Sequence, residues 1–420
     1  MALSNRQKLA LNQSTATVNL WYGSVRSSKT YGQIHDFIAR MSMATGQGTN
    51  LVVGYSTNTV WRNIFQPIVS RPEFAAIAPH LRYRQNAPTG TLFGKPFSVV
   101  GANNEASWLA IQGLTVENAW GDEATGWPES FYDMLYSRLS LPNSRALLTC
   151  NPGTGNHYLK RRVIDKNDPD VHVEKFLLEE NPTLPPEYVA RLHRQYTGLF
   201  YRRMILAEWV AAEGAVYQSW DPDTMVQPLP DPAGLQLLAT GVDYGVTNPS
   251  AGVALALSDD GVLWVVDEWN PNPGRDQRMT DVQLADSYTN WENQLVLKYG
   301  GLPRRRYADP SAASFIEEMR GRRLPFVKAS NRVVDGINTV ASNLDGQRLL
   351  LAPGTPALQA ELSEYRWDPK ATERGEDKPV KVNDHHADAL RYAVYSSKSL
   401  WRNRVRPVSY THLRAHETDS

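Results

Sequence analysis

A short loop near the start of the chain combines glycine, serine, lysine and threonine in a spacing that suits a phosphate ligand. Residues 23–30 read GSVRSSKT and match the pattern G-x-x-x-x-G-K-[ST] from Gly23 onward, except that Ser28 stands at the second glycine. In such a loop backbone N–H groups surround a phosphate at a helix N-terminus, Lys29 meets the outer phosphates, and the Thr30 hydroxyl reaches Mg²⁺. ATP with Mg²⁺ is the implied ligand. The alternative is a serine-rich turn that contains Lys-Thr by chance.

Two adjacent carboxylates follow a later apolar stretch around residues 119–120. In a phosphate-loop ATPase, Asp122 would hold Mg²⁺ through water and Glu123 would orient or deprotonate the attacking water. Taken alone, such a pair is usually a solvated helix start. Its place after the loop and behind a strand favours ATP hydrolysis.

Three acidic positions in the second half of the chain suggest a different chemistry. Asp243 and Asp309 each follow a strand-like run, and the sequence Asp-His-His-Ala-Asp occupies residues 384–388. Phosphodiester hydrolysis by two metal ions needs several converging carboxylates, so that the ions lie about 3.5–4 Å apart. We expect Asp243 to bridge both ions, with Asp309 and the helix that carries Asp388 each completing one side. For Asp243 alone, the alternative is an Asx turn.

The third acidic position is expected at the start of a helix. His385 and Asp388 are three residues apart and Asp384 and Asp388 are four apart, so one helix face can present all three side chains. Asp384 is equally suited to cap the helix, and both roles stay open. His386 points elsewhere and is expected to be structural.

The elements that must position the first group alternate in α/β fashion. Strand-like runs are expected at 18–22, 51–55, 97–101, 119–120 and 146–150, with helical stretches from the loop to about residue 43 and at 57–69. This order predicts an N-terminal P-loop ATPase domain over residues 1–180 with a mostly parallel sheet. A long helical pattern at 187–210 follows, and we expect residues 181–226 to be a helical linker.

A second α/β domain is expected over residues 227–400. Its strand-like runs at 237–241, 251–257 and 262–267 predict an antiparallel meander, and strands at 307–309 and 326–328 then alternate with helices at 311–320 and 333–344. The last helix begins near Asp384. Two domains suit a chain of 420 residues.

Composition excludes several classes of protein. The single cysteine, Cys150, leaves no internal disulfide and no cysteine zinc site, and no apolar run approaches the roughly 20 residues that span a membrane. Lys and Arg total 44 and Asp and Glu total 44, so contact with nucleic acid must come from local patches. A basic cluster that could hold a phosphate backbone without reading sequence comprises Arg304, Arg305, Arg306, Arg320, Arg322, Arg323 and Lys328.

In their order, these motifs resemble the terminase large subunits of tailed double-stranded DNA bacteriophages, over roughly residues 18–396. Residues 148–152 (LTCNP) match the family's coupling motif, a strand end thought to link nucleotide state to DNA movement. Residues 181–217 look like the family's linker and the start of its nuclease. The resemblance implies a ribonuclease H-like nuclease domain and favours His385 and Asp388 as metal ligands, for Mg²⁺ or Mn²⁺.

The resemblance also implies an activity and a set of partners. The expected function is ATP-driven translocation of double-stranded DNA into a procapsid, with cleavage of concatemeric DNA. The expected partners are the portal protein, the small terminase subunit and further copies in a ring of five, docked on the procapsid in the host cytoplasm, with no membrane. Arg26 would sense the γ-phosphate or be a solvated loop residue, and Arg138 would act on a neighbouring subunit or form a surface ion pair. A β-hairpin is expected at 370–381.

Two other functions fit part of the pattern. One is a transposase- or integrase-type nuclease with an ATP-gated regulatory domain, although a nucleotide sensor does not need the Asp122–Glu123 pair. The other is a packaging scaffold that does not hydrolyse ATP, suggested only by Ser28. The tail at 401–420 is set aside, because its end, residues 408–420, resembles translated sequencing-adapter read-through. In the family, the C-terminus helps docking on the portal.

Overall fold

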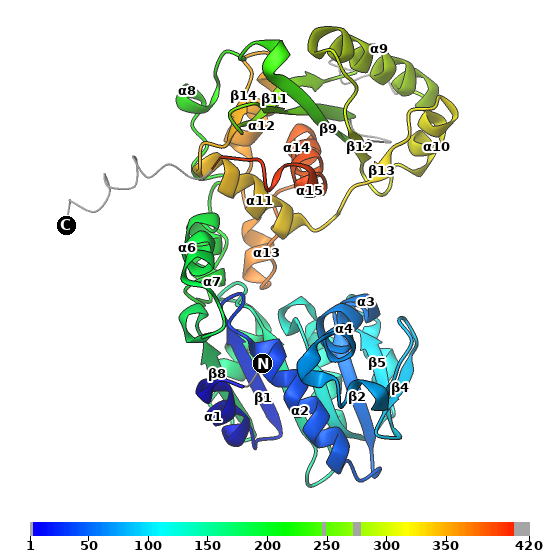
Figure 1. Ribbon diagram of the computed structural model, residues 1–420, viewed down its shortest axis with the longest axis vertical. Helices are drawn as coiled ribbons and strands as arrows, with labels where there is room; N and C mark the ends of the chain where they lie inside the picture. The colour runs from blue at the N-terminus through cyan, green and yellow to red at the C-terminus, as the bar shows by residue number, and fades with distance from the viewer. Residues whose placement is uncertain (1–2, 246–248, 272–278, 407–420) are drawn as a thin grey trace, which may run out of the picture. The chain divides into compact units, whose positions relative to one another are not determined.

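The chain forms two compact units in a computed structural model that describes residues 3–245, 249–271 and 279–406 (Figure 1). The first unit extends to residue 211 and also includes residues 373–376, and the second begins at residue 212. Both units have the expected α/β fold. The region 181–226, expected to be a linker, is divided between the two units. Within the described residues, no helix has the length and apolar character to cross a membrane.

The first unit is built on an eight-stranded sheet with the order β3-β4-β5-β2-β6-β7-β1-β8. Its strands are β1 (Val18–Gly23), β2 (Thr49–Gly54), β3 (Leu81–Arg82), β4 (Thr89–Leu92), β5 (Lys95–Gly101), β6 (Val116–Gly121), β7 (Arg145–Cys150) and β8 (Val171–Phe176). All pairings from β5 to β8 are parallel, which confirms the predicted sheet. The antiparallel edge of β3 and β4, and strand β8, were not predicted.

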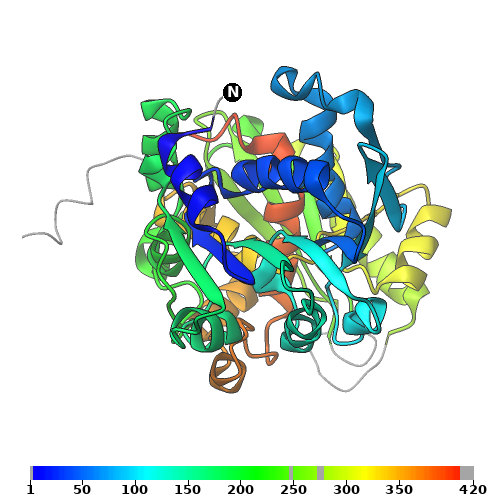
Figure 2. The ribbon, with the colours of Figure 1, turned by 90° about the horizontal axis from the view of Figure 1, so that it is seen from below.

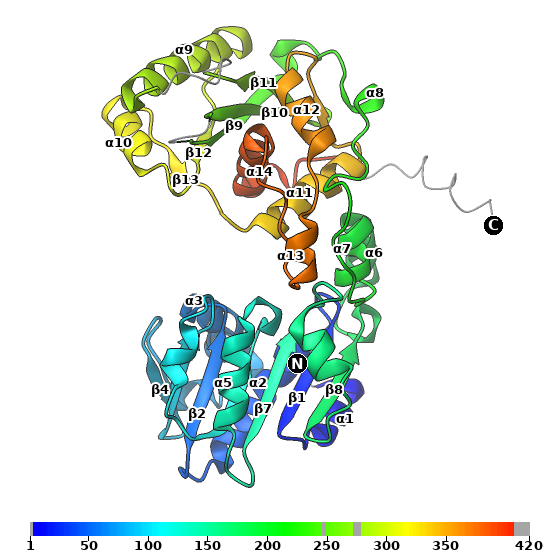
Figure 3. The same cartoon turned by 180° about the vertical axis from the view of Figure 1, so that it is seen from behind.

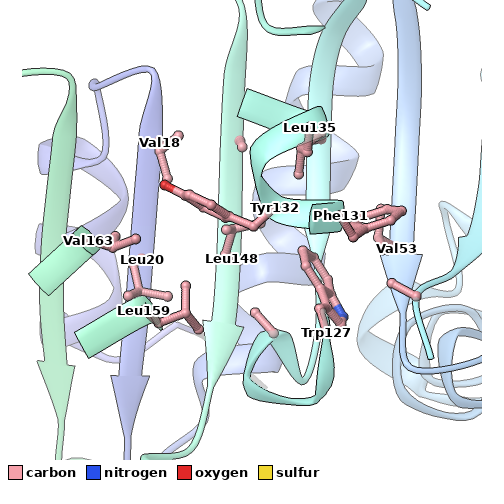
Figure 4. Packing of buried hydrophobic residues seen from close by; sticks show 14 of the residues in the cluster. Val18, Leu20, Val53, Trp127, Phe131, Tyr132, Leu135, Leu148, Leu159 and Val163 are labelled. Carbon is pink, nitrogen blue, oxygen red and sulfur yellow. The ribbon is translucent and has the colours of Figure 1, made fainter. Parts of the chain in front are cut away.

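Helices cover both faces of this sheet, as a parallel sheet requires. The helices of the first unit are α1 (Asn5–Gln13), α2 (Lys29–Met43), α3 (Thr57–Val60), α4 (Gln66–Ser70), α5 (Glu129–Arg138), α6 (Pro186–Gln195) and α7 (Gly198–Met204), with π-helices at Trp61–Phe65 and Leu159–Ile164. Figure 2 shows α1 and α2 on one face of the sheet, and Figure 3 shows α5 in front of the other. Side chains alternate along the strands, so Trp21 joins the α2 core and Leu20 the α5 core. Figure 4 shows Tyr132 of α5 beside Leu148 and Phe131 beside Val53.

The long helix expected at 187–210 is instead two short helices. Tyr196 and Thr197 between α6 and α7 have extended backbone angles, with φ −98° and −140°. Leu192 and Ile205 pack in a small cluster with partly buried Val25 of the phosphate loop. The prediction was wrong because burial against the loop stabilises two helices that change direction, which helical periodicity alone does not reveal.

The second unit contains a six-stranded sheet with the order β13-β12-β9-β10-β11-β14. Its strands are β9 (Leu235–Asp243), β10 (Ala251–Ser258), β11 (Leu263–Trp269), β12 (Arg305–Ala308), β13 (Val327–Lys328) and β14 (Leu349–Leu351). Its helices are α8 (Pro222–Met225), α9 (Asp281–Tyr299), α10 (Ala313–Gly321), α11 (Val333–Asp345), α12 (Pro356–Glu364), α13 (Pro369–Glu373, whose last residue groups with the first unit), α14 (His385–Ser396) and α15 (Lys398–Trp401). The antiparallel meander of β9, β10 and β11 confirms the prediction.

Two elements near the second sheet differ from expectation. Helix α9 was missed, although Thr280 and Gln283 form a capping box at its start and Gly300 ends it in the left-handed conformation. The expected hairpin at 370–381 is a short helix, α13, flanked by antiparallel contacts that include a bridge between Trp367 and Pro379. The tail beyond residue 406 lies outside the described residues.

Helix α14 lies directly on β9, because β9 carries a glycine at the point of contact. A Cβ atom on Gly241 would lie 2.1 Å from the Ala389 carbonyl oxygen. The preceding residue, Thr240, faces the opposite side and bonds Tyr288 of α9 at 2.7 Å. The close approach places the first turn of α14 beside the end of β9, where Asp243 lies.

Gly241→Ala should therefore loosen α14. Overpacking at this contact should cost about 1–3 kcal/mol of local stability, because backbone and not a flexible side chain must move. Hydrogen exchange of the full chain should show faster exchange across α14 and β9. Gly301→Ala, whose added Cβ meets nothing within 4 Å, is the matched control and should change protection little. Equal protection in both variants would contradict this account of the α14 contact.

Candidate functional site

The first candidate site lies where parallel strands of the first sheet end. Strand β1 pairs with β7 and β8 in parallel register, so the loop after Gly23 emerges beside the end of both. A Cβ on Gly23 would lie 1.9 Å from the Phe176 carbonyl oxygen of β8, so only glycine fits this approach. The loop then enters α2 at Lys29.

The backbone of this loop is strained at two residues. Arg26 and Ser28 both have positive φ, 58° and 66°, a conformation that glycine adopts more easily. Ser28 thus takes the conformation that suits the glycine it replaces. The carbonyl of Ser28 accepts a bond from Gln7 at 2.9 Å, and that of Arg26 accepts one from Asn181 at 2.6 Å. These bonds from distant segments hold the loop in place.

Lys29 is buried inside the loop. Its ammonium donates to the carbonyls of Ser24 and Gly23, at 2.8 and 3.2 Å. Burial lowers the pKa of Lys29 to about 8, while the charge of Asp122 opposes the shift. The ammonium is therefore held by weak neutral acceptors that a phosphate would outcompete.

Asp122, directly after β6, receives three hydrogen bonds. One carboxylate oxygen accepts from Thr30 at 3.0 Å and from Thr149 at 2.7 Å, and the other accepts from Asn63 at 2.8 Å. A hydroxyl and a carboxylate side by side near a phosphate loop suit Mg²⁺, which keeps waters and phosphate oxygens as its other ligands. Thr30 and Asp122 would hold the ion.

Glu123 and the loop line one cavity of about 580 Å³. Glu123 has φ 57°, an unusual backbone conformation for a residue that is not glycine, and such strain is often found at functional sites. Arg26, Ser28, Lys29, Thr30 and Asp122 also line this cavity. Exposed Arg26 is thus where a phosphate-sensing residue could act, whereas Arg138 does not line the cavity.

Two residues that position this site were not recognised in the sequence. Asn63 comes from the π-helix after α3, and such helices recur at functional sites. Gln33 is buried in α2 and donates to the carbonyls of Gly121 at 2.8 Å and Leu147 at 2.7 Å, which ties α2 to β6 and β7. Gln33, a polar residue on the buried face of a helix, was the feature of the sequence that could have revealed this positioning role.

The second candidate site lies at the ends of β9 and β12. These strands pair in parallel, and the Asp309 N–H donates to the Val242 carbonyl at 3.0 Å, so Asp243 and Asp309 lie at one edge of the sheet. Helix α14 brings His385 beside them, and the His385 Nδ1 lies 2.9 Å from an Asp243 oxygen. The structure therefore brings the predicted acidic positions to one region.

Charge accumulates around Asp243. Burial raises the pKa of Asp243, and the charges of Asp388 and Asp309 add to the rise, while the bond from His385 opposes it. The same bond raises the pKa of His385, against the effect of burial. Both shifts favour keeping a proton in this pair.

Asp309 is bonded to its own neighbours. Burial acts to raise its pKa, but bonds from Ser311 and from the Tyr392 hydroxyl lower it overall. Tyr392 lies on α14, so this bond also fixes the helix to the end of β12. Sequence analysis did not single out Tyr392.

Asp388 is held by cations. Its Oδ1 lies 3.0 Å from Arg391, which is almost fully buried, and its Oδ2 accepts from Lys381 at 2.7 Å. The Lys381 ammonium also lies 2.8 Å from Asp384 Oδ2. Asp384 occupies the N-cap position of α14 but makes no side-chain cap bond.

The N-terminus of α14 is instead capped from another helix. Glu361 of α12 accepts the Ala387 N–H at 2.9 Å and contacts His386 Nδ1 at 2.8 Å. His386 is therefore bound to Glu361, consistent with the structural role expected for it. The long-range cap could not be inferred from local spacing.

The acidic residues do not fit a metal ion as they are arranged. Among the described residues, no group of three or more His, Cys, Asp or Glu side chains is placed to hold one. Asp388 already bonds two cations, Asp243 bonds His385, and Asp309 bonds Tyr392. The side chains expected to bind metal therefore lie in one region but are not arranged around a common metal position. They are Asp243, Asp309, His385 and Asp388.

The basic cluster is smaller on the surface than expected. Arg306 forms a buried two-bond pair with Glu292, at 2.6 Å for each bond. Arg322 pairs with Asp286 and Glu318, and Arg320 with Glu317. The exposed remainder of the cluster is Arg304, Arg305, Arg323 and Lys328.

A family model and solved structures indicate the same family for this chain. The family model described as phage terminase large subunit matches residues 15–205. The large terminase of a thermophilic bacteriophage, in complex with ADP, is 30% identical, with 94% of this chain and 99% of that chain covered and a TM-score of 0.82. The complex of the same phage protein with ATP-γ-S is 30% identical over the same shares, with a TM-score of 0.81. A comparison with curated proteins finds no match.

Binding of a nucleoside triphosphate should be coupled to proton uptake by Lys29. Phosphate charge favours the ammonium, so a lysine with a pKa of about 8 should gain about half a proton at pH 8 on binding. Affinity should weaken as pH rises above 8, because the free protein then loses this charge. Calorimetry at pH 8 in two buffers of different ionisation enthalpy measures the uptake. Lys29→Met should abolish it, and an equal uptake in that variant would exclude Lys29 as the group.

Proposed function

The chain belongs to the phage terminase large subunits, and on that premise we propose that it hydrolyses ATP to drive double-stranded DNA into a procapsid and cleaves that DNA in its second unit. The observation that carries the proposal is the cavity at the carboxyl ends of parallel strands, where the phosphate loop meets Asp122 and Glu123. No comparison supports the alternative of an integrase-type nuclease with a regulatory domain.

The first unit would bind ATP through the phosphate loop. The two structures of the thermophilic phage protein contain ADP and ATP-γ-S, which supports a nucleotide in the same cavity here. Lys29 would exchange its loop carbonyls for phosphate oxygens, and Thr30 with Asp122 would hold Mg²⁺, which supplies charge neutralisation at the phosphates. Glu123 would accept a proton from, or orient, the attacking water.

The coupling motif, residues 148–152, contacts the expected Mg²⁺ ligand Asp122 directly. Thr149 donates to the same oxygen of Asp122 that accepts from Thr30. Two residues later, the Asn151 amide lies 3.7 Å from the sulfur of Met204, at the end of α7. If hydrolysis changed the hydrogen-bond partners of Asp122, the bond from Thr149 of β7 would change with them. The contact between Asn151 and Met204 would then transmit this change to α7.

The second unit would cleave DNA at the acidic positions. Asp243 and Asp309 lie at one sheet edge with His385 in contact with Asp243, and hydrolysis of a phosphodiester by metal ions would require these side chains and Asp388 to converge on the ions. Burial and the charges of Asp388 and Asp309 raise the pKa of Asp243, and a divalent cation bound beside these carboxylates would offset their charge. Mg²⁺ or Mn²⁺ would serve, once the Asp388 carboxylate is available.

Partners follow from family membership. The exposed arginines near β12 and the lysine of β13 would contact the DNA backbone without reading its sequence. We propose a ring of copies, five in number, that docks on the portal protein of a procapsid in the host cytoplasm and receives DNA from the small subunit. Arg26 would report on the γ-phosphate, and Arg138, outside the cavity, would be free to act on a neighbouring copy.

The two activities should be separable by single substitutions. Glu123→Gln should lower ATP turnover by about 10²–10⁴-fold with binding retained, since only the proton acceptor is lost. Lys29→Ala should lose both turnover and nucleotide affinity, and Asp243→Ala should lose DNA cleavage alone. Assays of phosphate release with portal and DNA, and of plasmid cutting with Mn²⁺, measure both activities on the full chain.

Two exposed positions provide controls. Lys8→Ala on α1 and Gln294→Ala on α9 lie outside both sites and should leave both activities near those of the original chain. ATP turnover unchanged in Glu123→Gln would exclude Glu123 as the base. Cleavage that survives Asp243→Ala would place the nuclease elsewhere.

A further inference from the structure

One lysine lies where the acidic site would need a metal ion. The Lys381 ammonium is 2.7 Å from Asp388 Oδ2 and 2.8 Å from Asp384 Oδ2. The Lys381 side chain is 58% exposed, whereas each of the two carboxylates is only 8% exposed. A solvent-accessible cation therefore covers two nearly buried anions.

The local charges are balanced without a metal. Asp388 meets buried Arg391 with its other oxygen, and Lys381 serves both Asp384 and Asp388. Asp384 Oδ2 makes no hydrogen bond in addition to this ion pair, so Lys381 is its main compensation. The two carboxylates are thus neutralised by two cations. For this reason, no group of side chains among the described residues is arranged to bind a metal ion.

We propose that Lys381 is an internal counter-ion that takes the place of a divalent cation at Asp388, so that a metal ion enters the site only as this lysine leaves. The inference rests on the proposed nuclease function of the second unit. It makes Lys381 a positioning residue for the site, because it controls whether the Asp388 carboxylate is available.

The surroundings allow Lys381 to leave and Arg391 to stay. Arg391 is 1% exposed and packs against Gly336 of α11, where an added Cβ would lie 2.5 Å from its side chain. The Lys381 side chain is more than half exposed, and the backbone is anchored just before it by the Val380 N–H, which donates to the Arg366 carbonyl at 2.9 Å. Only side-chain rotation is needed to release the ammonium. Because the lysine half of each pair is exposed, solvent screens these pairs more than it screens the buried pair of Asp388 with Arg391.

The test compares Mn²⁺ binding by the nucleotide-free full chain and its variants, followed by electron paramagnetic resonance. Lys381→Met keeps the stem and removes the charge, so Mn²⁺ should bind about threefold to tenfold more tightly. Lys381→Arg keeps the charge and should bind Mn²⁺ more weakly than Lys381→Met. Lys370→Met, at an exposed lysine of α13, is the matched control and should bind as the original chain does.

Two further readouts keep the outcomes distinct. The Mn²⁺ concentration that gives half-maximal plasmid cutting should fall in Lys381→Met by the same factor as the dissociation constant. If Asp243→Ala leaves Mn²⁺ binding unchanged, the proposed nuclease site itself is wrong. If Asp243→Ala weakens binding but Lys381→Met does not strengthen it, the site stands and the role of Lys381 is excluded. Weaker Mn²⁺ binding in Lys381→Met would likewise exclude it.

Discussion

Parallel pairing of neighbouring strands is the constraint on which both candidate sites depend. Strands that run in the same direction end at the same sheet edge, so residues far apart in sequence meet there. In the first unit this brings the loop after β1, Asp122 after β6 and Thr149 of β7 together. In the second unit it brings Asp243, the last residue of β9, near Asp309, which follows β12. Each sheet therefore provides one edge where buried polar groups can be concentrated.

Concentrating charge at such an edge costs solvation, and each site offsets this cost with groups of its own chain. Lys29 donates hydrogen bonds to carbonyls of the loop, and Asp122 accepts hydrogen bonds from three neutral side chains. Asp388 forms ion pairs with two cations. Neutral donors leave the first site open to a charged ligand. The ion pairs of the second site oppose one, so the two sites differ in how easily a ligand enters.

Local spacing predicted the features of the fold that depend on neighbours in sequence. The phosphate loop, the Asp122–Glu123 pair and the meander belong to this class, because a few consecutive residues define them. Ser28 shows the limit of the motif, since its positive φ keeps the geometry that glycine would give. The parts that could not be predicted depend on contacts across the fold. Asn63 reaches Asp122 from a π-helix, and Glu361 of α12 caps α14 at the Ala387 N–H.

The central claim is that each unit carries its chemistry at the parallel edge of its own sheet. Anomalous diffraction from crystals of the full chain, grown with Mn²⁺ and an ATP analogue, tests it most directly. The account predicts one manganese peak beside the phosphates at Thr30 and Asp122, and another among Asp243, Asp309 and Asp388, with the Lys381 ammonium displaced. Manganese peaks away from both edges, or a manganese ion at Asp388 with Lys381 still bound to it, would contradict the account.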